Sequence, residues 1–270
     1  MTSRWTSAPA DDPDAIIVCT AATRPRGLYD DLVRDLAVAH IPHHHVVVTV
    51  PREGANINGT LGEKLAGLRR LATSPDIGGT YKRIVLCDAF DVMYVGGVEG
   101  RDELIAKIPV NGVVVAAERN AWPCNHPALR DHLHPPNADS VWCWCNGGFI
   151  AGGPGAILEW CDWVEKSPGY GPLHIDQMFI NWQLMLKRGA GPGGTTLHDT
   201  RTEVVYCLSR DEGEIGVSVG EGGVVRAVNT VFGTRPLFLH FNGSWPVEPY
   251  LRMVDEARRW SGGAMARAWQ

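Results

Sequence analysis

Short apolar runs alternate with segments of helical spacing along the first third of the chain, and this alternation strongly constrains the fold. The runs at residues 15–22, 43–50 and 83–88 carry the β-branched residues that buried strands favour. Between them, residues 27–40 and 63–73 place apolar side chains at helical spacing. Strands that alternate with helices are typical of a central, mostly parallel sheet flanked by helices. The sequence therefore predicts an α/β fold.

The remainder of the chain continues this pattern. Further strands are expected at residues 112–118, 146–153, 202–209, 223–230 and 237–243, and further helices at 155–167 and 176–189. No internal repeat and no linker interrupts the pattern after residue 15. We therefore expect a flexible tail at residues 1–14, a single domain at residues 15–246, and a C-terminal helix or tail at residues 247–270.

Charge, hydropathy and cysteine content indicate where the protein is located and which partners it can bind. The net charge of −5, without any run of basic residues, gives no general attraction to nucleic acid. The polar start lacks a secretory signal, and no apolar run approaches the roughly 20 residues that cross a bilayer. An odd count of seven cysteines favours reduced thiols, and Cys143 and Cys145 are interpreted as packed core residues. These features predict a cytoplasmic protein without a membrane partner.

Two carboxylates follow the strand at residues 83–88. Asp88 ends the apolar run, and Asp91 comes one turn later, at the sheet edge where open α/β folds bind ligands. Oxygen ligands converging on one point suit Mg²⁺ or Mn²⁺. The alternative is that Asp88 caps a turn and Asp91 pairs with Lys82 or Arg83. The spacing alone favours this alternative, because Asp is also a common turn residue.

A series of motifs adds to that spacing. In chain order they are "CTAATR", "GTLGEKLAGLRRL", "VLCDAFDVMYVGG", "AAERNAWP", "CNGGFIAG", "IDQMF" and "NTVFGTRPLFLHFNGS", spread from about residue 15 to residue 245. The series resembles, in the same order, the glycosyltransferase domain of the procollagen lysyl hydroxylases. The resemblance implies the GT-A fold, with an acidic motif that holds a metal ion and a nucleotide-sugar diphosphate.

The resemblance also implies which residues form the site. It places Mn²⁺, with Mg²⁺ as the alternative ion, on Asp88, Asp91 and His240. The donor, a UDP-sugar, would contact Thr20, Lys64, Asp88, Phe90, Asn242 and Gly243. The sugar and the acceptor would lie near Trp122, Asn146, Gly147, Gly148 and Gln177.

Two carboxylates are candidates for the base that deprotonates an acceptor hydroxyl. Asp176 and Glu118 fall in matching motifs and are the predicted catalytic residues. Asp176 has the alternative role of capping the helix that follows it, and Glu118 that of pairing with Arg119 or Arg83. For Trp142 and Trp144, packing in the core is favoured over stacking on a sugar ring.

The chain departs from the family in several places. Ile175 precedes Asp176 where the family has an acidic run. Cys145 stands at the position of the family's asparagine, and Asn146 stands at the position of the serine that follows it. Residues 244–246, Ser-Trp-Pro, replace a segment that carries a lysine in the family. The dioxygenase and accessory domains of those enzymes are absent from this sequence.

The predicted function is therefore metal-dependent transfer of a sugar, from a UDP-hexose, to a hydroxyl group. The acceptor is a hydroxylysine-like group, a hydroxylated small molecule or a hydroxymethylated base in DNA, so nucleic acid enters only as an acceptor. Two alternatives remain open. One is a nucleotidyltransferase acting on sugar phosphates, and the other is a catalytically inactive protein that binds carbohydrate or nucleotide.

Overall fold

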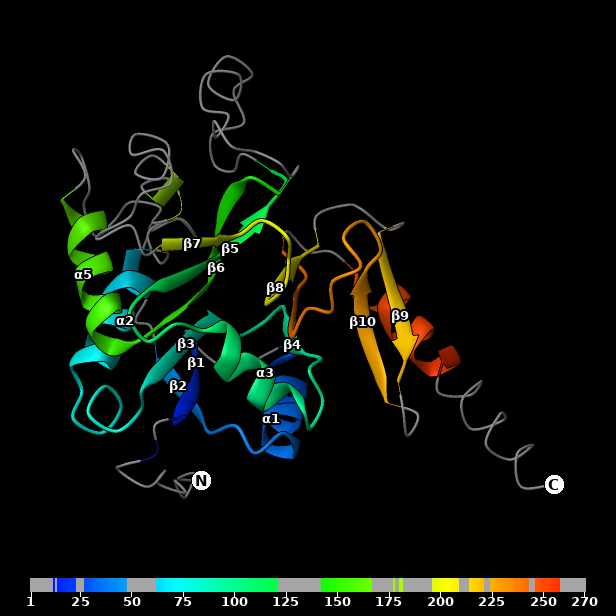
Figure 1. Cartoon of the computed structure of the whole chain (residues 1–270), viewed down its shortest axis with the longest axis horizontal. Helices are drawn as coiled ribbons and strands as arrows, with labels where there is room; N and C mark the ends of the chain where they lie inside the picture. Colours follow the sequence, from blue (N-terminus) through cyan, green and yellow to red (C-terminus); the bar gives the residue numbers. More distant parts are fainter. Residues whose placement is uncertain are drawn as a thin grey trace, which may run out of the picture.

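A six-stranded sheet forms the centre of the molecule (Figure 1). The computed structural model describes residues 12, 14–22, 27–47, 62–120, 142–166, 177, 180, 181, 196–208, 214–220, 224–242 and 246–257. The sheet contains β1 (Ile16–Ala22), β2 (His43–Val47), β3 (Arg83–Asp88), β5 (Val113–Glu118), β6 (Trp144–Gly152) and β7 (Thr196–Asp199), in the order β2-β1-β3-β6-β5-β7. Neighbours are parallel except at β6, which runs antiparallel to both β3 and β5. The predicted mostly parallel sheet is confirmed.

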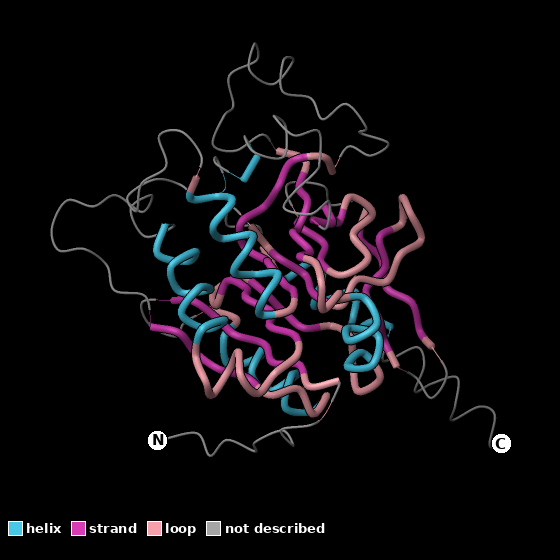
Figure 2. Tube along the Cα trace, turned by 60° about the vertical axis from the view of Figure 1, so that its left-hand side comes forward, coloured by secondary structure: helices cyan, strands magenta, loops and turns pink. Residues whose placement is uncertain are grey.

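Helices cover both faces of this sheet (Figure 2). Successive side chains of a strand point to opposite faces, so alternate residues of β1 enter different cores. Ile16 and Val18 pack with Leu32 and Leu36 of α1 (Tyr29–Val38). The alternate residues of β1, Ile17, Cys19 and Ala21, pack in a second core with α2 (Gly62–Thr73) and α5 (Pro154–Glu165).

A smaller sheet lies beside the first and brings the second half of the chain to the end of β3. It contains β4 (Val92–Tyr94), β11 (Phe238–His240) and β8 (Val205–Cys207). The central strand, β11, runs antiparallel to β4 and parallel to β8. Because β4 follows β3 after only a short turn, the pairing places residue 240 next to the acidic pair.

A hairpin of β9 (Ile215–Val219) and β10 (Val225–Asn229) extends to one side of the sheets (Figure 1). Residues 248–257 are helical, and Tyr250 and Val254 pack in one core cluster with residues of the hairpin. This places a helix within the region predicted as a C-terminal helix or tail. The division into tail, domain and C-terminal segment remains a prediction.

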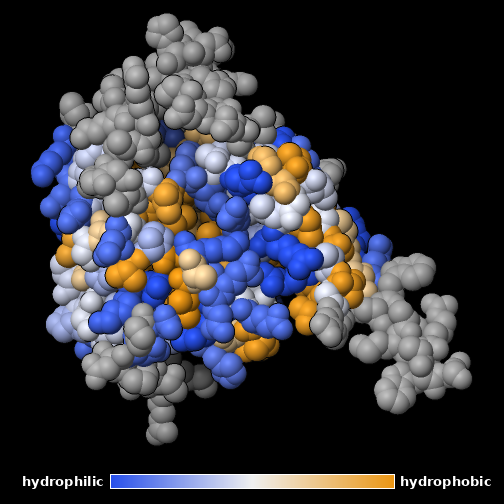
Figure 3. Space-filling view, viewed as in Figure 1, coloured by the Kyte–Doolittle hydropathy of each residue, from blue (hydrophilic) through white to orange (hydrophobic). Residues whose placement is uncertain are grey.

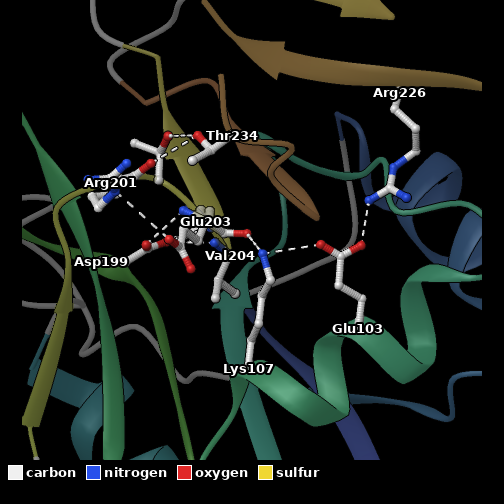
Figure 4. Close-up of polar contacts among 10 residues, drawn as sticks. Glu103, Lys107, Asp199, Arg201, Glu203, Val204, Arg226 and Thr234 are labelled. Carbon is white, nitrogen blue, oxygen red and sulfur yellow. Dashed lines mark hydrogen bonds and ion pairs between the residues drawn. The ribbon is translucent and has the colours of Figure 1, made fainter. Parts of the chain in front are cut away.

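Polar contacts join the hairpin to α3 (Gly100–Lys107) (Figure 4). Arg226 of β10 donates to Glu103 Oε2 at 2.9 Å. Lys107 lies 3.1 Å from the other oxygen of Glu103 and donates to the carbonyl of Glu203 at 2.9 Å. The charged face of α3 therefore holds the segment before β8 and the hairpin together.

Most expected elements are present with bounds shifted by a few residues. Four elements, α3, β4, β7 and β9, are not among the helices and strands expected from the sequence. The helix expected at residues 176–189 lies largely outside the described residues, of which 177, 180 and 181 are helical. The six described cysteines, Cys19, Cys87, Cys143, Cys145, Cys161 and Cys207, are buried and form no disulfide with one another, as expected of packed thiols.

The described surface has no extended apolar area on the face drawn in Figure 3, where hydrophobic residues are interspersed with hydrophilic ones. The exposed large hydrophobic side chains are spread along the described parts of the chain: Val38, Val98, Val110, Leu197, Val219, Val224, Val231 and Leu251. Among the helices that the structure describes, none has the length and apolar character needed to cross a membrane.

Candidate functional site

Three potential metal ligands meet at the carboxyl end of β3. Asp88 is the last residue of β3, Asp91 lies in the turn before β4, and His240 is the last residue of β11. Register pairing sets His240 opposite Val92, and the N–H of Phe241 donates to the Asp91 carbonyl at 2.7 Å. One ligand atom from each of the three side chains lies within 4.8 Å of the others. In the described part of the chain, this is the only such group of three or more residues.

The spacing of the ligand atoms fits a common cation. His240 Nε2 lies 3.5 Å from Asp91 Oδ2 and 3.7 Å from Asp88 Oδ2. Two ligands that are each about 2.1 Å from one ion lie roughly 3 to 4 Å apart. Gly148 keeps this space open, because a Cβ there would come 2.2 Å from Cε1 of His240 and 2.9 Å from Asp88 Oδ2. The donor set and the open space therefore fit a divalent ion.

The electrostatics of the group also favour a cation. Burial opposes ionisation of Asp91, but His240 and Lys64 hold the pKa of Asp91 below its ordinary value. Burial likewise lowers the pKa of His240, yet the carboxylates of Asp91 and Asp88 hold that pKa above its ordinary value. The acidic pair thus creates a negative potential that attracts positive charge.

Lys64 supplies one positive charge at this point. Its Nζ atom, from the first turn of α2, lies 2.5 Å from Asp88 Oδ1. The alternative partners predicted for Asp91, Lys82 and Arg83, lie at the other end of β3, where Arg83 Nε donates to the carbonyl of Ile108 at 2.8 Å. The acids therefore pair with Lys64 and His240, and the alternative pairing of Asp91 with Lys82 or Arg83 is wrong.

Two other predicted nucleotide contacts lie nearby. Thr20 is buried in β1, and its hydroxyl is 3.0 Å from His43 Nε2 and 3.1 Å from His45 Nδ1. These two histidines share a face of β2, as residues two apart in a strand do. The carbonyl of Phe90 accepts the N–H of Leu28 at 3.0 Å. The turn between the two acids is thereby fixed to the segment that leads into α1.

A cluster of amides surrounds Glu118, the last residue of β5. Its carboxylate accepts N–H groups from Gln177 and, at 2.7 Å, from Asn242. Gln177 Oε1 in turn accepts the N–H of Gly147 at 3.0 Å. The side chain of Asn146 also bonds to Glu118. The Glu118 carboxylate thus joins Asn146 and Gln177, which were predicted to lie near the sugar, to Asn242, which was predicted to contact the nucleotide.

The environment of Glu118 leaves it with an unusual acidity. Burial raises the pKa of Glu118 to about 7, against the opposing effect of the amide hydrogen bonds. The expected alternative of an ion pair with Arg119 is not seen, since Arg119 contacts Glu214 and stacks over Trp142. Among the described residues, Oδ1 of Asn242 is a buried acceptor without a hydrogen-bond partner.

Sequence reasoning missed two residues that support the site. Cys207 Sγ lies 3.7 Å from His240 Nδ1, and no sequence signal marked this cysteine. Asn181 accepts the N–H of Cys145 at 2.6 Å and donates to its carbonyl at 3.3 Å, which fastens the helical segment to β6. A signal for Asn181 existed, because Gln177 lies four residues before it and so shares its helix face.

The remaining predicted residues divide into packed and undescribed ones. Asp176, Trp122 and Gly243 lie outside the described residues. Trp142 is fully buried against Tyr206 and Phe232, and Trp144 is also buried. The interpretation of these two tryptophans as core residues is confirmed.

Comparison with known proteins supports the fold. No protein-family model matches the chain, and no curated protein sequence matches it. Among solved structures, the chain is similar to a glycosyltransferase involved in the glycosylation of the major capsid of PBCV-1, with a TM-score of 0.51 and 10% sequence identity. The match covers 88% of this chain and 98% of that one. The predicted fold class, an α/β fold of the GT-A glycosyltransferase type, is thereby confirmed.

Proposed function

We propose that this chain is a metal-dependent glycosyltransferase that moves a hexose from a UDP-sugar to a hydroxyl group. The observation that carries the proposal is the convergence of Asp88, Asp91 and His240 on the space that Gly148 leaves open. The site lies at the carboxyl end of a strand in a glycosyltransferase-type fold, the edge where such sheets bind ligands.

The chemistry requires stabilisation of a departing nucleoside diphosphate. A divalent ion held by Asp88, Asp91 and His240 would act as a Lewis acid toward the negative charge of that leaving group. An imidazole beside two carboxylates suits Mn²⁺ better than Mg²⁺. Lys64 presents an ammonium group at the same edge, and ammonium groups are common phosphate ligands.

The amide cluster supports recognition of the sugar. Glu118 holds the side-chain amides of Gln177 and Asn242 in fixed orientations by accepting their N–H groups. This leaves Asn242 Oδ1 as an acceptor for a hydroxyl of the donor sugar. Gly147 and Gly148 have no side chains, so a sugar ring can approach the backbone closely.

Deprotonation of the acceptor is assigned to Glu118 or Asp176. A pKa near 7 suits Glu118 to exchange a proton at neutral pH. Both candidates remain predictions. The acceptor class remains a hydroxylated compound: a hydroxylysine-like group, a small molecule or a hydroxymethylated base.

The test is release of UDP or GDP from a panel of nucleotide sugars, with water as the acceptor. The panel contains UDP-glucose, UDP-galactose, UDP-N-acetylglucosamine and GDP-mannose, each with MnCl₂ or with EDTA. We expect Mn²⁺-dependent release from one UDP-hexose, reduced about 100-fold or more in Asp91→Asn, since one metal ligand is lost. Asp76→Asn is the matched control, because Asp76 is an exposed carboxylate in the turn after α2.

Two results would contradict the proposal. One is turnover by the wild type that EDTA does not reduce and that Asp91→Asn retains in full. The other is absence of both turnover and Mn²⁺-dependent UDP binding by calorimetry. Pyrophosphate release from UTP and a sugar phosphate would instead identify a nucleotidyltransferase, and binding of a UDP-sugar without turnover would identify an inactive binding protein.

A further inference from the structure

One carboxylate is shared between a lysine and the candidate metal position. Lys64 Nζ lies 2.5 Å from Asp88 Oδ1, while Oδ2 of the same aspartate lies 3.7 Å from His240 Nε2. The Lys64 side chain is only 13% exposed. Its ammonium group therefore places a positive charge directly beside the group of potential metal ligands.

This arrangement opposes metal binding in the absence of another anion. A divalent ion bound to Asp88 would sit close to the Lys64 ammonium, and the two positive charges would repel each other. Water screens this repulsion weakly, because the lysine is largely buried and His240 is almost completely buried. The lysine also withdraws negative charge from Asp88, which weakens that carboxylate as a metal ligand.

A diphosphate changes this balance. Its phosphate groups bring negative charge to the same point, and the flexible stem of a lysine lets the ammonium turn from a carboxylate to a phosphate. Asp88 is then released to the metal ion. The repulsion between the two cations is also offset by the anion between them.

We propose that Lys64 couples the binding of the metal ion and the diphosphate. In the nucleotide-free protein, Lys64 holds Asp88 and keeps metal affinity low, and on nucleotide binding it transfers to the diphosphate. The inference rests on the proposed function, because it concerns the same metal and nucleotide site. By thermodynamic linkage, the metal ion and the nucleotide each raise the affinity for the other by the same factor.

The first measurement is Mn²⁺ binding without nucleotide, followed by the electron paramagnetic resonance signal of free Mn²⁺. We expect Lys64→Met to bind Mn²⁺ about tenfold more tightly than the wild type, because a neighbouring positive charge is removed. Lys64→Arg keeps the charge and is expected to bind no more tightly than the wild type. Lys82→Met is the matched control, since Lys82 is exposed just before the opposite end of β3.

The second measurement is UDP binding by calorimetry, in EDTA and then with Mn²⁺. We expect Lys64→Met to bind UDP about tenfold more weakly than the wild type in EDTA, because the phosphate contact is lost. The factor by which UDP raises Mn²⁺ affinity falls in this variant. Lys64→Gln provides a second neutral variant, and thermal unfolding of each variant verifies that it is folded.

The outcomes separate this inference from the proposed function. Mn²⁺ binding by Lys64→Met that is equal to or weaker than wild-type binding would overturn the coupling role and leave the metal site intact. Equal UDP affinity of the variant and the wild type in EDTA would also overturn it. Absence of Mn²⁺ binding by every protein, with and without UDP, would overturn the metal site and both proposals together.

Discussion

The sulfur of Cys207 lies 3.7 Å from Nδ1 of His240, while the other ring nitrogen, Nε2, faces the carboxylates of Asp88 and Asp91. The contact follows from the parallel register of β8 and β11, which pairs Cys207 with His240. Burial raises the pKa of the Cys207 thiol well above its ordinary value, so the thiol stays neutral. An Nε2 atom that binds metal needs its proton on Nδ1, and the sulfur is then the acceptor for that N–H.

Replacing this thiol tests its effect on the imidazole. We expect Cys207→Ala to weaken Mn²⁺ binding about tenfold, the low end of the range for partners of metal-bound histidines, since sulfur is a weak acceptor. Cys207→Ser keeps an acceptor and is expected to stay within about threefold of the wild type. Calorimetric titration with MnCl₂ in the presence of UDP measures both. Cys161→Ala removes an equally buried thiol from α5 and is the control. Equal affinities of Cys207→Ala and Cys207→Ser would contradict the role.

Gly148 offers a test of the open space at the metal position. We expect Gly148→Ala to lower Mn²⁺ affinity about tenfold or more, because its methyl group would overlap His240 and crowd Asp88. Gly155→Ala in the first turn of α5 meets nothing within 4 Å and is expected to bind Mn²⁺ as the wild type does. Thermal unfolding of both variants separates loss of binding from loss of folding. Unchanged Mn²⁺ affinity in Gly148→Ala would place the metal elsewhere.

The part of the fold that the sequence predicts well is encoded locally. The apolar runs of β1, β3 and β5 and the Leu spacing of α1 and α2 are visible within single segments. The four missed elements, α3, β4, β7 and β9, give weaker local signals. Leu104 is the one large buried side chain of the mostly polar α3, and β9 includes a glycine and a serine. Strand direction is also not a local property, so the antiparallel placement of β6 had no sequence signal.

In the candidate site too, some features are encoded locally and others depend on contacts between distant segments. Asp88 was predictable as a rim residue because it directly follows a buried run. Its meeting with His240 depends on the pairing of β11 with β4, which joins distant segments, and only the family resemblance indicated it. The roles of Cys207 and of the Lys64 ammonium depend on packing between separate elements. Side-chain contacts of this kind leave no periodic pattern in a sequence.

The contact between Glu103 and Arg226 is expected to stabilise the junction of α3 and the hairpin (Figure 4). The side chains are 33% and 11% exposed, so water screens the pair less than it screens a surface pair. A double-mutant cycle with Glu103→Gln and Arg226→Met should give a coupling free energy of about 1 kcal/mol in urea unfolding. The exposed pair Asp31 and Arg34 should give less than about 0.5 kcal/mol. A coupling equal to that of the exposed pair would show that the contact adds nothing.

Glu118 is expected to make the stability of the protein depend on pH. Its folded pKa of about 7 lies above the ordinary value of 4.5, so the folded state binds this proton more tightly than the unfolded state does. Stability from this group is therefore fully present below about pH 4.5 and is lost as the pH rises through 7. The difference between 4.5 and about 7 corresponds to a change of about 3 kcal/mol in the free energy of unfolding.

The measurement is urea unfolding of the wild type and of Glu118→Gln at pH 5 and pH 8, in EDTA. Glutamine stays neutral at both pH values, so the difference between the two proteins isolates this carboxyl from other titrating groups such as His240 and Asp199. We expect the wild type to lose stability relative to Glu118→Gln as the pH rises. A difference that stays constant between the two pH values would mean that Glu118 is ionised in the folded protein throughout this range. Its carboxylate would then serve to hold the amides of Gln177 and Asn242, without a proton to exchange near neutral pH.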